Sequence, residues 1–226
     1  ATVSLEPIPE TKGMVLLAYD SVGDAMGDVS PIVEHDPAAT EVIDDVLLDL
    51  ARETPEFAPV TEMLPEGTGA VLIVEFYAED REEAERKIAT LLADRLPEYE
   101  PASEPAEAVP EPDAERRAFD AIEAYDEESR AKVWKLRKSG LPILLSRTTD
   151  EKHVAFVEDT AIPPENLPGF VADFQAMLDE HDTYASFYAH AGPGVLHIRP
   201  LVNTKTEVGL EAMESIADAA TDLVVE

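Results

Sequence analysis

One stretch of the chain decides its fold: Phe187-Tyr188-Ala189-His190-Ala191-Gly192-Pro193-Gly194-Val195-Leu196-His197-Ile198-Arg199-Pro200. The glycines and the proline in its middle are a turn signal, and apolar and polar residues alternate strictly on either side. A four-residue loop over residues 191–194 places Tyr188 opposite His197 and His190 opposite Val195. The stretch therefore predicts a β-hairpin.

Side chains alternate between the two faces of a strand, so this hairpin has a polar face and an apolar face. The polar face is predicted to carry Ser186, Tyr188, His190, His197 and Arg199. The apolar face is predicted to carry Ala185, Phe187, Ala189, Leu196 and Ile198. A loop one residue longer or shorter would put the two histidines on opposite faces. We expect the apolar face to belong to a core and the polar face to form the candidate site.

The two histidines are the main chemical candidates of this face. They would lie diagonally across the strands, roughly 7–8 Å apart at the backbone, within reach of long side chains. His190 and His197 could share a metal ion, or one could accept a proton beside an arginine that holds an anion. Tyr188 and Arg199 are candidate substrate-binding residues. The alternative is a pair of exposed or hydrogen-bonded sheet histidines, because a divalent metal site usually has three or four ligands.

Composition limits the protein class. A chain of 226 residues forms one medium domain or two small ones, and the absence of cysteine excludes disulfides and thiolate sites. No run of about 18 apolar residues predicts a membrane helix. No charged-then-apolar leader opens the chain, so the sequence gives no sign of secretion. The net charge of −32 is spread along the chain, as in the cytoplasmic proteins of halophiles, and it argues against nucleic acid as a partner.

Strand and helix signals alternate along the chain. The strands are expected at residues 14–19, 39–43, 70–77 and 154–158, besides the hairpin. The helices are expected at residues 21–34, 44–52, 81–96, 113–125, 127–138, 164–180 and 206–224. Residues 97–112 contain five prolines and are expected to form an exposed connection.

These signals predict a single domain built from two β-α-β halves, at about residues 1–97 and 150–226. Residues 98–149 join the halves through the proline-rich connection and helices. Because hairpins as well as helices join the strands, the expected fold is α+β and ferredoxin-like, with a mostly antiparallel sheet and helices packed on one face. No glycine-rich phosphate fingerprint follows a strand, so this chain alone is not expected to hold a dinucleotide.

Other charged residues are weaker candidates. Arg137 follows Trp134 late in a helix and could bind the carboxylate of an organic acid, although a solvated cation near a helix end is the alternative. Glu158 and Asp159 are adjacent on a strand, so only one of them is expected to join a site, and Asp159 or Thr160 is expected to cap the next helix. Glu41 and Asp44 carry a fainter signal, and Glu75 is expected to face water.

Three stretches of the chain together resemble the C-terminal substrate (cap) domain of FAD-linked oxidases, the group that contains D-lactate dehydrogenases and glycolate oxidase. These stretches are residues 134–137, 156–163 and 188–200. Within this group, the chain most resembles the large FAD/FMN-containing dehydrogenases. The resemblance implies a domain that covers an FAD held by a separate upstream domain, and oxidation of a D-2-hydroxy acid such as D-lactate or glycolate. It also implies that His190 and His197 bind a divalent metal such as zinc or manganese, or orient the substrate, and that Arg137 holds the substrate carboxylate.

The chain departs from the common family loop, Gly-His-Xaa-Gly-Asp-Gly-Asn-Xaa-His, at Ala189, Pro193 and Val195. A third, acidic ligand of the family would follow the last helix, beyond Glu226. We therefore expect a fragment of a longer enzyme, inactive alone, with an iron–sulfur domain or subunit as a further candidate partner and membrane association only through the full enzyme. Two other readings stay open: a ferredoxin-like binding or regulatory module, and a metal-dependent hydrolase that uses the two histidines.

Overall fold

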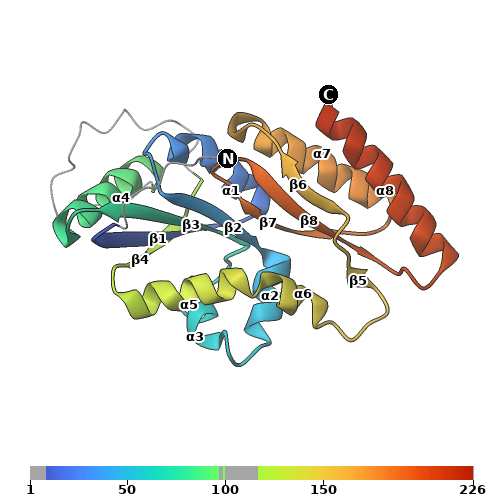
Figure 1. Cartoon of the computed structure of the whole chain (residues 1–226), viewed down its shortest axis with the longest axis horizontal. Coiled ribbons are helices and arrows are strands. Elements are labelled where there is room, and N and C mark those ends of the chain that lie inside the picture. Colours follow the sequence, from blue (N-terminus) through green and yellow to red (C-terminus); the bar gives the residue numbers. More distant parts are fainter. Residues whose placement is uncertain (1–8, 97–98, 100–116, 226) are drawn as a thin grey trace, which may run out of the picture.

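The computed structural model describes residues 9–96, 99 and 117–225, and these form one eight-stranded antiparallel sheet (Figure 1). The strands follow the order β4-β1-β3-β2-β7-β8-β5, and β6 also pairs with β8. Their bounds are β1 (Thr11–Tyr19), β2 (Ala39–Asp44), β3 (Ala70–Ala78), β4 (Asp120–Ala124), β5 (Lys152–His153), β6 (Val157–Ala161), β7 (Ala185–His190) and β8 (Val195–Val202).

The sheet consists of two similar halves. In the first half, α1 (Val22–Val33) links β1 to β2, and β3 lies between those strands. In the second half, α7 (Leu167–Glu180) links β6 to β7, and β8 lies between them. The halves join where β2 pairs with β7. This arrangement of two split β-α-β units confirms the predicted α+β fold with an antiparallel sheet.

Helices cover both faces of the sheet, whereas the sequence predicted helices on one face. One core cluster joins the sheet to α1, α4 (Arg81–Arg95), α7 and α8 (Glu207–Val225). The other face packs against α2 (Asp45–Arg52), α3 (Ala58–Thr61), α5 (Glu127–Lys138) and α6 (Gly140–Leu145). Figure 1 shows these two layers above and below the sheet. The reason is that β1 and β3 carry apolar residues on both of their faces. A strand that is buried on both sides has a nearly continuous run of apolar residues, so both faces need a covering layer.

A second difference concerns residues 113–125, which were expected to be helical. Residues 113–116 and the proline-rich connection lie outside the described residues, apart from Tyr99. Residues 120–124 form β4, which pairs with β1 at the sheet edge. The alanines and glutamates of this segment favour a helix locally, but pairing with an apolar neighbour strand outweighs a weak intrinsic preference.

The β7–β8 hairpin has the predicted register, with Tyr188 paired to His197 and His190 to Val195. Asp44 fixes the start of the hairpin. Its carboxylate accepts hydrogen bonds from the backbone of Phe187 at 2.6 Å and from the hydroxyl of Ser186 at 2.9 Å, while it also caps α2 through Leu47. Burial raises the pKa of Asp44 to about 7, although these three hydrogen bonds act to lower it. The acid therefore ties the hairpin to the helix layer below it.

The hairpin loop depends on Gly194, whose φ of 72° lies in the left-handed region. A Cβ atom at this position would lie 1.8 Å from the carbonyl oxygen of Ile162. We expect Gly194→Ala to lower the free energy of unfolding by at least about 1 kcal/mol, as measured by urea denaturation. Gly169→Ala is the control, because a Cβ there meets no atom within 4 Å and α7 favours alanine. Equal stability of the two variants would contradict the prediction.

No helix among the described residues is long and apolar enough to cross a lipid bilayer.

Candidate functional site

The polar face of the hairpin is formed as the sequence predicts. The ring centroids of His190 and His197 lie 5.3 Å apart, with an angle of 78° between the ring planes. The ring of Tyr188 lies 5.2 Å from that of His197. Both imidazoles therefore leave the same side of the sheet, because the four-residue loop preserves the strand parity.

Glu41 brings the first histidine and an arginine together. It is directly opposite His190 in the β2–β7 pairing. Its two carboxylate oxygens lie 2.9 and 3.0 Å from Nδ1 of His190. Arg137, in the last turn of α5, donates from Nε to the same carboxylate at 3.0 Å and places Nη2 at 2.8 Å. The Arg137 side chain is buried, so its alternative reading as a solvated helix charge does not hold.

Glu158 does the same for the second histidine. Its Oε2 lies 2.8 Å from Nδ1 of His197, and its Oε1 forms an ion pair with Nη1 of Arg199. In each case, one carboxylate contacts both an imidazole and a guanidinium. The two units, Glu41 with His190 and Arg137 and Glu158 with His197 and Arg199, are called the two triads below.

Tyr188 connects the two triads. The guanidinium carbon of Arg137 lies 5.1 Å from the centroid of its ring, and that of Arg199 lies 5.2 Å away. Arg199 also donates from Nη2 to the Tyr188 hydroxyl at 2.7 Å. Cations at such distances are attracted to an aromatic face. The structure therefore brings all five residues predicted for the site into one cluster.

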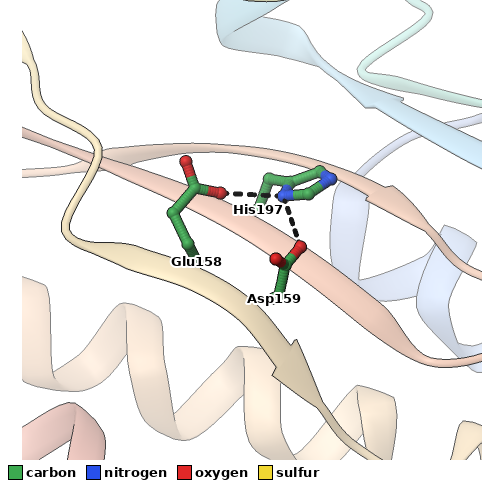
Figure 2. A group of neighbouring side chains, drawn as sticks. All are labelled: Glu158, Asp159 and His197. Carbon is green, nitrogen blue, oxygen red and sulfur yellow. Dashed lines mark hydrogen bonds and ion pairs between the residues drawn. The ribbon is translucent and has the colours of Figure 1, made fainter.

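A β-bulge corrects the prediction for Glu158 and Asp159. The β6–β8 pairing shifts between Val157 and Thr160, so two residues of β6 oppose His197 alone. Asp159 has a φ of 50°, a conformation that aspartate tolerates better than most residues. Strict alternation is lost, and both acids approach His197 (Figure 2).

Asp159 consequently does not cap the next helix. That segment begins as a 3-10 turn at Pro164–Asn166, with Pro163 before it. Glu75 also differs from its prediction. It is buried and accepts hydrogen bonds from Trp134 at 2.9 Å and from Lys12 at 3.1 Å.

Glu41 is a candidate site residue for which the sequence pattern gave only a weak signal. Its signal was an acid in a short strand whose neighbours Val42 and Ile43 are apolar and buried. A buried acid in such a place needs a partner, because an unpaired buried charge is costly. The sequence does not show which cation supplies that partner, since Arg137 lies 96 residues away.

The donor set around His197 suits a divalent metal. Within the described part of the chain, Glu158, Asp159 and His197 form a group whose ligand atoms all lie within 4.8 Å of one another. One imidazole nitrogen with carboxylate oxygens is a donor set that zinc and manganese accept. His190 lies beside this group but is not a member of it.

Of the two imidazoles, that of His190 is the more accessible, since its side chain is 51% exposed and that of His197 is 17% exposed. Both arginines are buried, and each is balanced by a glutamate. The site thus combines an accessible imidazole with two buried arginines that are paired with glutamates.

Comparison with known proteins places this chain in a family. A model of "FAD linked oxidases, C-terminal domain" matches residues 8–226. The chain is 28% identical over 227 residues to a D-2-hydroxyglutarate dehydrogenase of Pseudomonas putida, covering 99% of this chain and 21% of that protein. It is 26% identical to a D-2-hydroxyglutarate dehydrogenase of Haemophilus influenzae, covering 100% and 21%. The chain therefore spans about a fifth of the length of these relatives.

Solved structures show the same fold at low identity. A 4-ethylphenol oxidase from Gulosibacter chungangensis, in complex with isoeugenol, aligns with a TM-score of 0.56 and 14% identity over 96% of this chain and 44% of its own. An alkyldihydroxyacetonephosphate synthase aligns with a TM-score of 0.57 and 13% identity over 97% and 39%. With the family model matching nearly the whole chain, this protein belongs to the C-terminal domain family of the FAD-linked oxidases.

Proposed function

We propose that this chain is the substrate-side domain of an FAD-dependent dehydrogenase that oxidises a D-2-hydroxy acid. The observation that carries the proposal is the cluster of two histidines, two arginines and a tyrosine on one face of the sheet. Family membership implies FAD as the cofactor. Its binding is assigned to an upstream domain of the same polypeptide, and an iron–sulfur domain or subunit is a further candidate partner.

D-2-hydroxyglutarate is the preferred substrate, ahead of D-lactate and glycolate. The relatives named for this acid match nearly the whole chain. The site also holds two guanidinium groups, and a planar guanidinium suits a carboxylate in two-pronged contact. A substrate with two carboxylates could use both, whereas lactate and glycolate have one carboxylate each. Because Arg137 and Arg199 are buried, their contact with substrate requires nearby side chains to move.

In this proposal His190 or His197 accepts the proton of the substrate hydroxyl, since imidazole is suited to general base catalysis near neutral pH. Arg137, with Tyr188 and Arg199, orients the acid so that its C2 hydrogen faces the flavin. FAD, when bound, accepts the hydride. Zinc or manganese, if held by His197, Glu158 and Asp159 beside His190, would polarise the hydroxyl.

The test uses the full-length enzyme purified with its flavin. Under anaerobic conditions we expect D-2-hydroxyglutarate to bleach the visible absorbance of the oxidised flavin, with L-2-hydroxyglutarate as the stereochemical control. D-lactate and glycolate should reduce the flavin more slowly. Binding of the acid with no flavin reduction would favour the alternative of a binding or regulatory module.

The metal-dependent hydrolase keeps little support, because the family matched consists of flavin enzymes. The dispersed negative charge still favours a halophile's cytoplasmic protein. Both the halophilic origin and the compartment remain predictions.

A further inference from the structure

We propose that Glu41 and Glu158 are positioning residues that fix His190 and His197 as Nδ1–H tautomers, so that Nε2 is the reactive nitrogen of each ring. The proposal deepens the function given above and rests on it for its catalytic meaning. Its structural part concerns only the two triads and can be tested without turnover.

The argument begins with what a carboxylate can do. An ionised carboxylate has no proton to donate, so a neutral imidazole nitrogen that bonds to it must carry the hydrogen. In both triads the nitrogen that faces the carboxylate is Nδ1, at 2.9–3.0 Å from Glu41 in His190 and at 2.8 Å from Glu158 in His197. Nε2 of each neutral ring is then left with its lone pair. In the metal-free chain, that nitrogen is the one available to accept a proton. A metal held by Glu158, Asp159 and His197 would instead displace the hydrogen on Nδ1 of His197, because Nδ1 is the atom that faces both acids.

Each of the two acids is paired with a buried arginine. Arg137 contacts Glu41 through Nε and Nη2, and Arg199 contacts Glu158 through Nη1. A guanidinium stays protonated at any ordinary pH and can only donate hydrogen bonds, so each acid is the acceptor toward its arginine. Each arginine also occupies an oxygen of its acid, which leaves the remaining carboxylate surface to one imidazole. The arginine thus acts on the histidine through the acid between them.

The glutamates of the two triads differ in their exposure to water. The side chain of Glu41 is 10% exposed, whereas that of Glu158 is 37% exposed. Hydrogen bonds to an ionised group are stronger where water is excluded. We therefore expect the tautomer of His190 to be the more strongly fixed.

The first measurement is made on the 226-residue chain with long-range ¹H–¹⁵N correlation spectra at about pH 8, above the ordinary pKa of imidazole. His190 and His197 should show the Nδ1–H pattern. Two other histidines calibrate the spectra. His153 directs Nδ1 at the carbonyl oxygen of Arg199 and should also be Nδ1–H, whereas His35 directs Nε2 at Asp94 and should be Nε2–H. An Nε2–H pattern for His190 and His197 in the wild-type chain would overturn the proposal without any variant.

The second measurement uses Glu41→Gln and Glu158→Gln. A glutamine has one oxygen, which the neighbouring arginine should claim, so its NH₂ group turns to the histidine and donates to Nδ1. Each variant should therefore convert its own histidine to the Nε2–H form and leave the other unchanged. Unchanged patterns in both variants would show that the acids do not set the tautomers.

Glu75→Gln is the matched control. Glu75 is a buried acid on the same side of the sheet, but its hydrogen bonds go to Trp134 and Lys12. The variant should leave both histidine patterns unchanged. A change as large as that of Glu41→Gln would mean that the tautomers respond to any loss of charge on this face, and the proposal would fail. Oδ1 of Asp159 lies 3.5 Å from Nδ1 of His197. The variant Asp159→Asn should also leave His197 in the Nδ1–H form.

The catalytic part is tested in the flavin-containing enzyme. Loss of such a supporting acid should lower the rate constant of flavin reduction roughly tenfold to a hundredfold, more for Glu41→Gln than for Glu158→Gln, while Glu75→Gln keeps the wild-type rate. Wild-type rates in both glutamine variants would overturn the positioning role. If the wild-type enzyme does not oxidise a D-2-hydroxy acid although the tautomers are as expected, the proposed function fails and the structural assignment stands.

Discussion

Replacing Arg137 with methionine is expected to lower the free energy of unfolding by roughly 3–5 kcal/mol. Methionine replaces the unbranched stem of the arginine but not its guanidinium, so it leaves the Glu41 carboxylate buried beside His190 without its cation. The cost comes from the uncompensated charge, since an ion taken out of water needs an opposite charge close to it. Urea denaturation of the 226-residue chain measures the loss.

A double-mutant cycle separates this effect from lost packing. Arg137→Met combined with Glu41→Gln should recover a large part of the stability, because the stranded charge is removed. The exposed pair Lys135–Glu56, whose lysine lies on the same helix, is the matched control. Its coupling energy should stay below about 1 kcal/mol. If the buried pair shows a coupling no larger than this exposed pair, Arg137 does not stabilise the site in the way we describe.

Replacing Phe187 with alanine is expected to lower the free energy of unfolding by roughly 3–5 kcal/mol. The side chain is 2% exposed and lies on the apolar face of the hairpin. Its ring meets that of Phe174 edge to face, with centroids 6.0 Å apart and an interplanar angle of 87°. Truncation removes the transfer free energy of the ring and leaves a cavity that α7 cannot fill without moving.

Phe119→Ala is the control for this prediction, because Phe119 is exposed and its loss should change stability by no more than about 0.5 kcal/mol. A result for Phe187→Ala within the range of the control would show that the apolar face does not anchor the hairpin. The histidines depend on this anchor, since Phe187 and Tyr188 point to opposite faces and burial of one directs the other toward the site.

Much of the fold followed from local patterns. The long apolar strands, the helix expected at residues 21–34 and the register of the hairpin were predicted from the periodicity of apolar residues and from turn chemistry. These features depend on residues near one another in the chain, so a single sequence contains the needed information. The second helix layer was missed, although the apolar residues at both parities of β1 and β3 carried its signal.

The site was predictable in its histidines and only partly in its supports. His190 and His197 belong to one hairpin, so the spacing between them sets their common face. The partner of Glu41 comes from a helix far along the chain, and Glu158 joins Asp159 only through an irregular strand pairing. A bulge depends on how two strands fit together, and alternation within one strand does not reveal it.

The sequence by itself determined which residues form strands and helices in most of the chain, and that two imidazoles share a face. The tertiary structure alone decided that each imidazole shares a carboxylate with an arginine. The physical reason is that periodicity and turn residues act over a few positions, whereas ion pairing in a dry environment depends on which distant elements pack together.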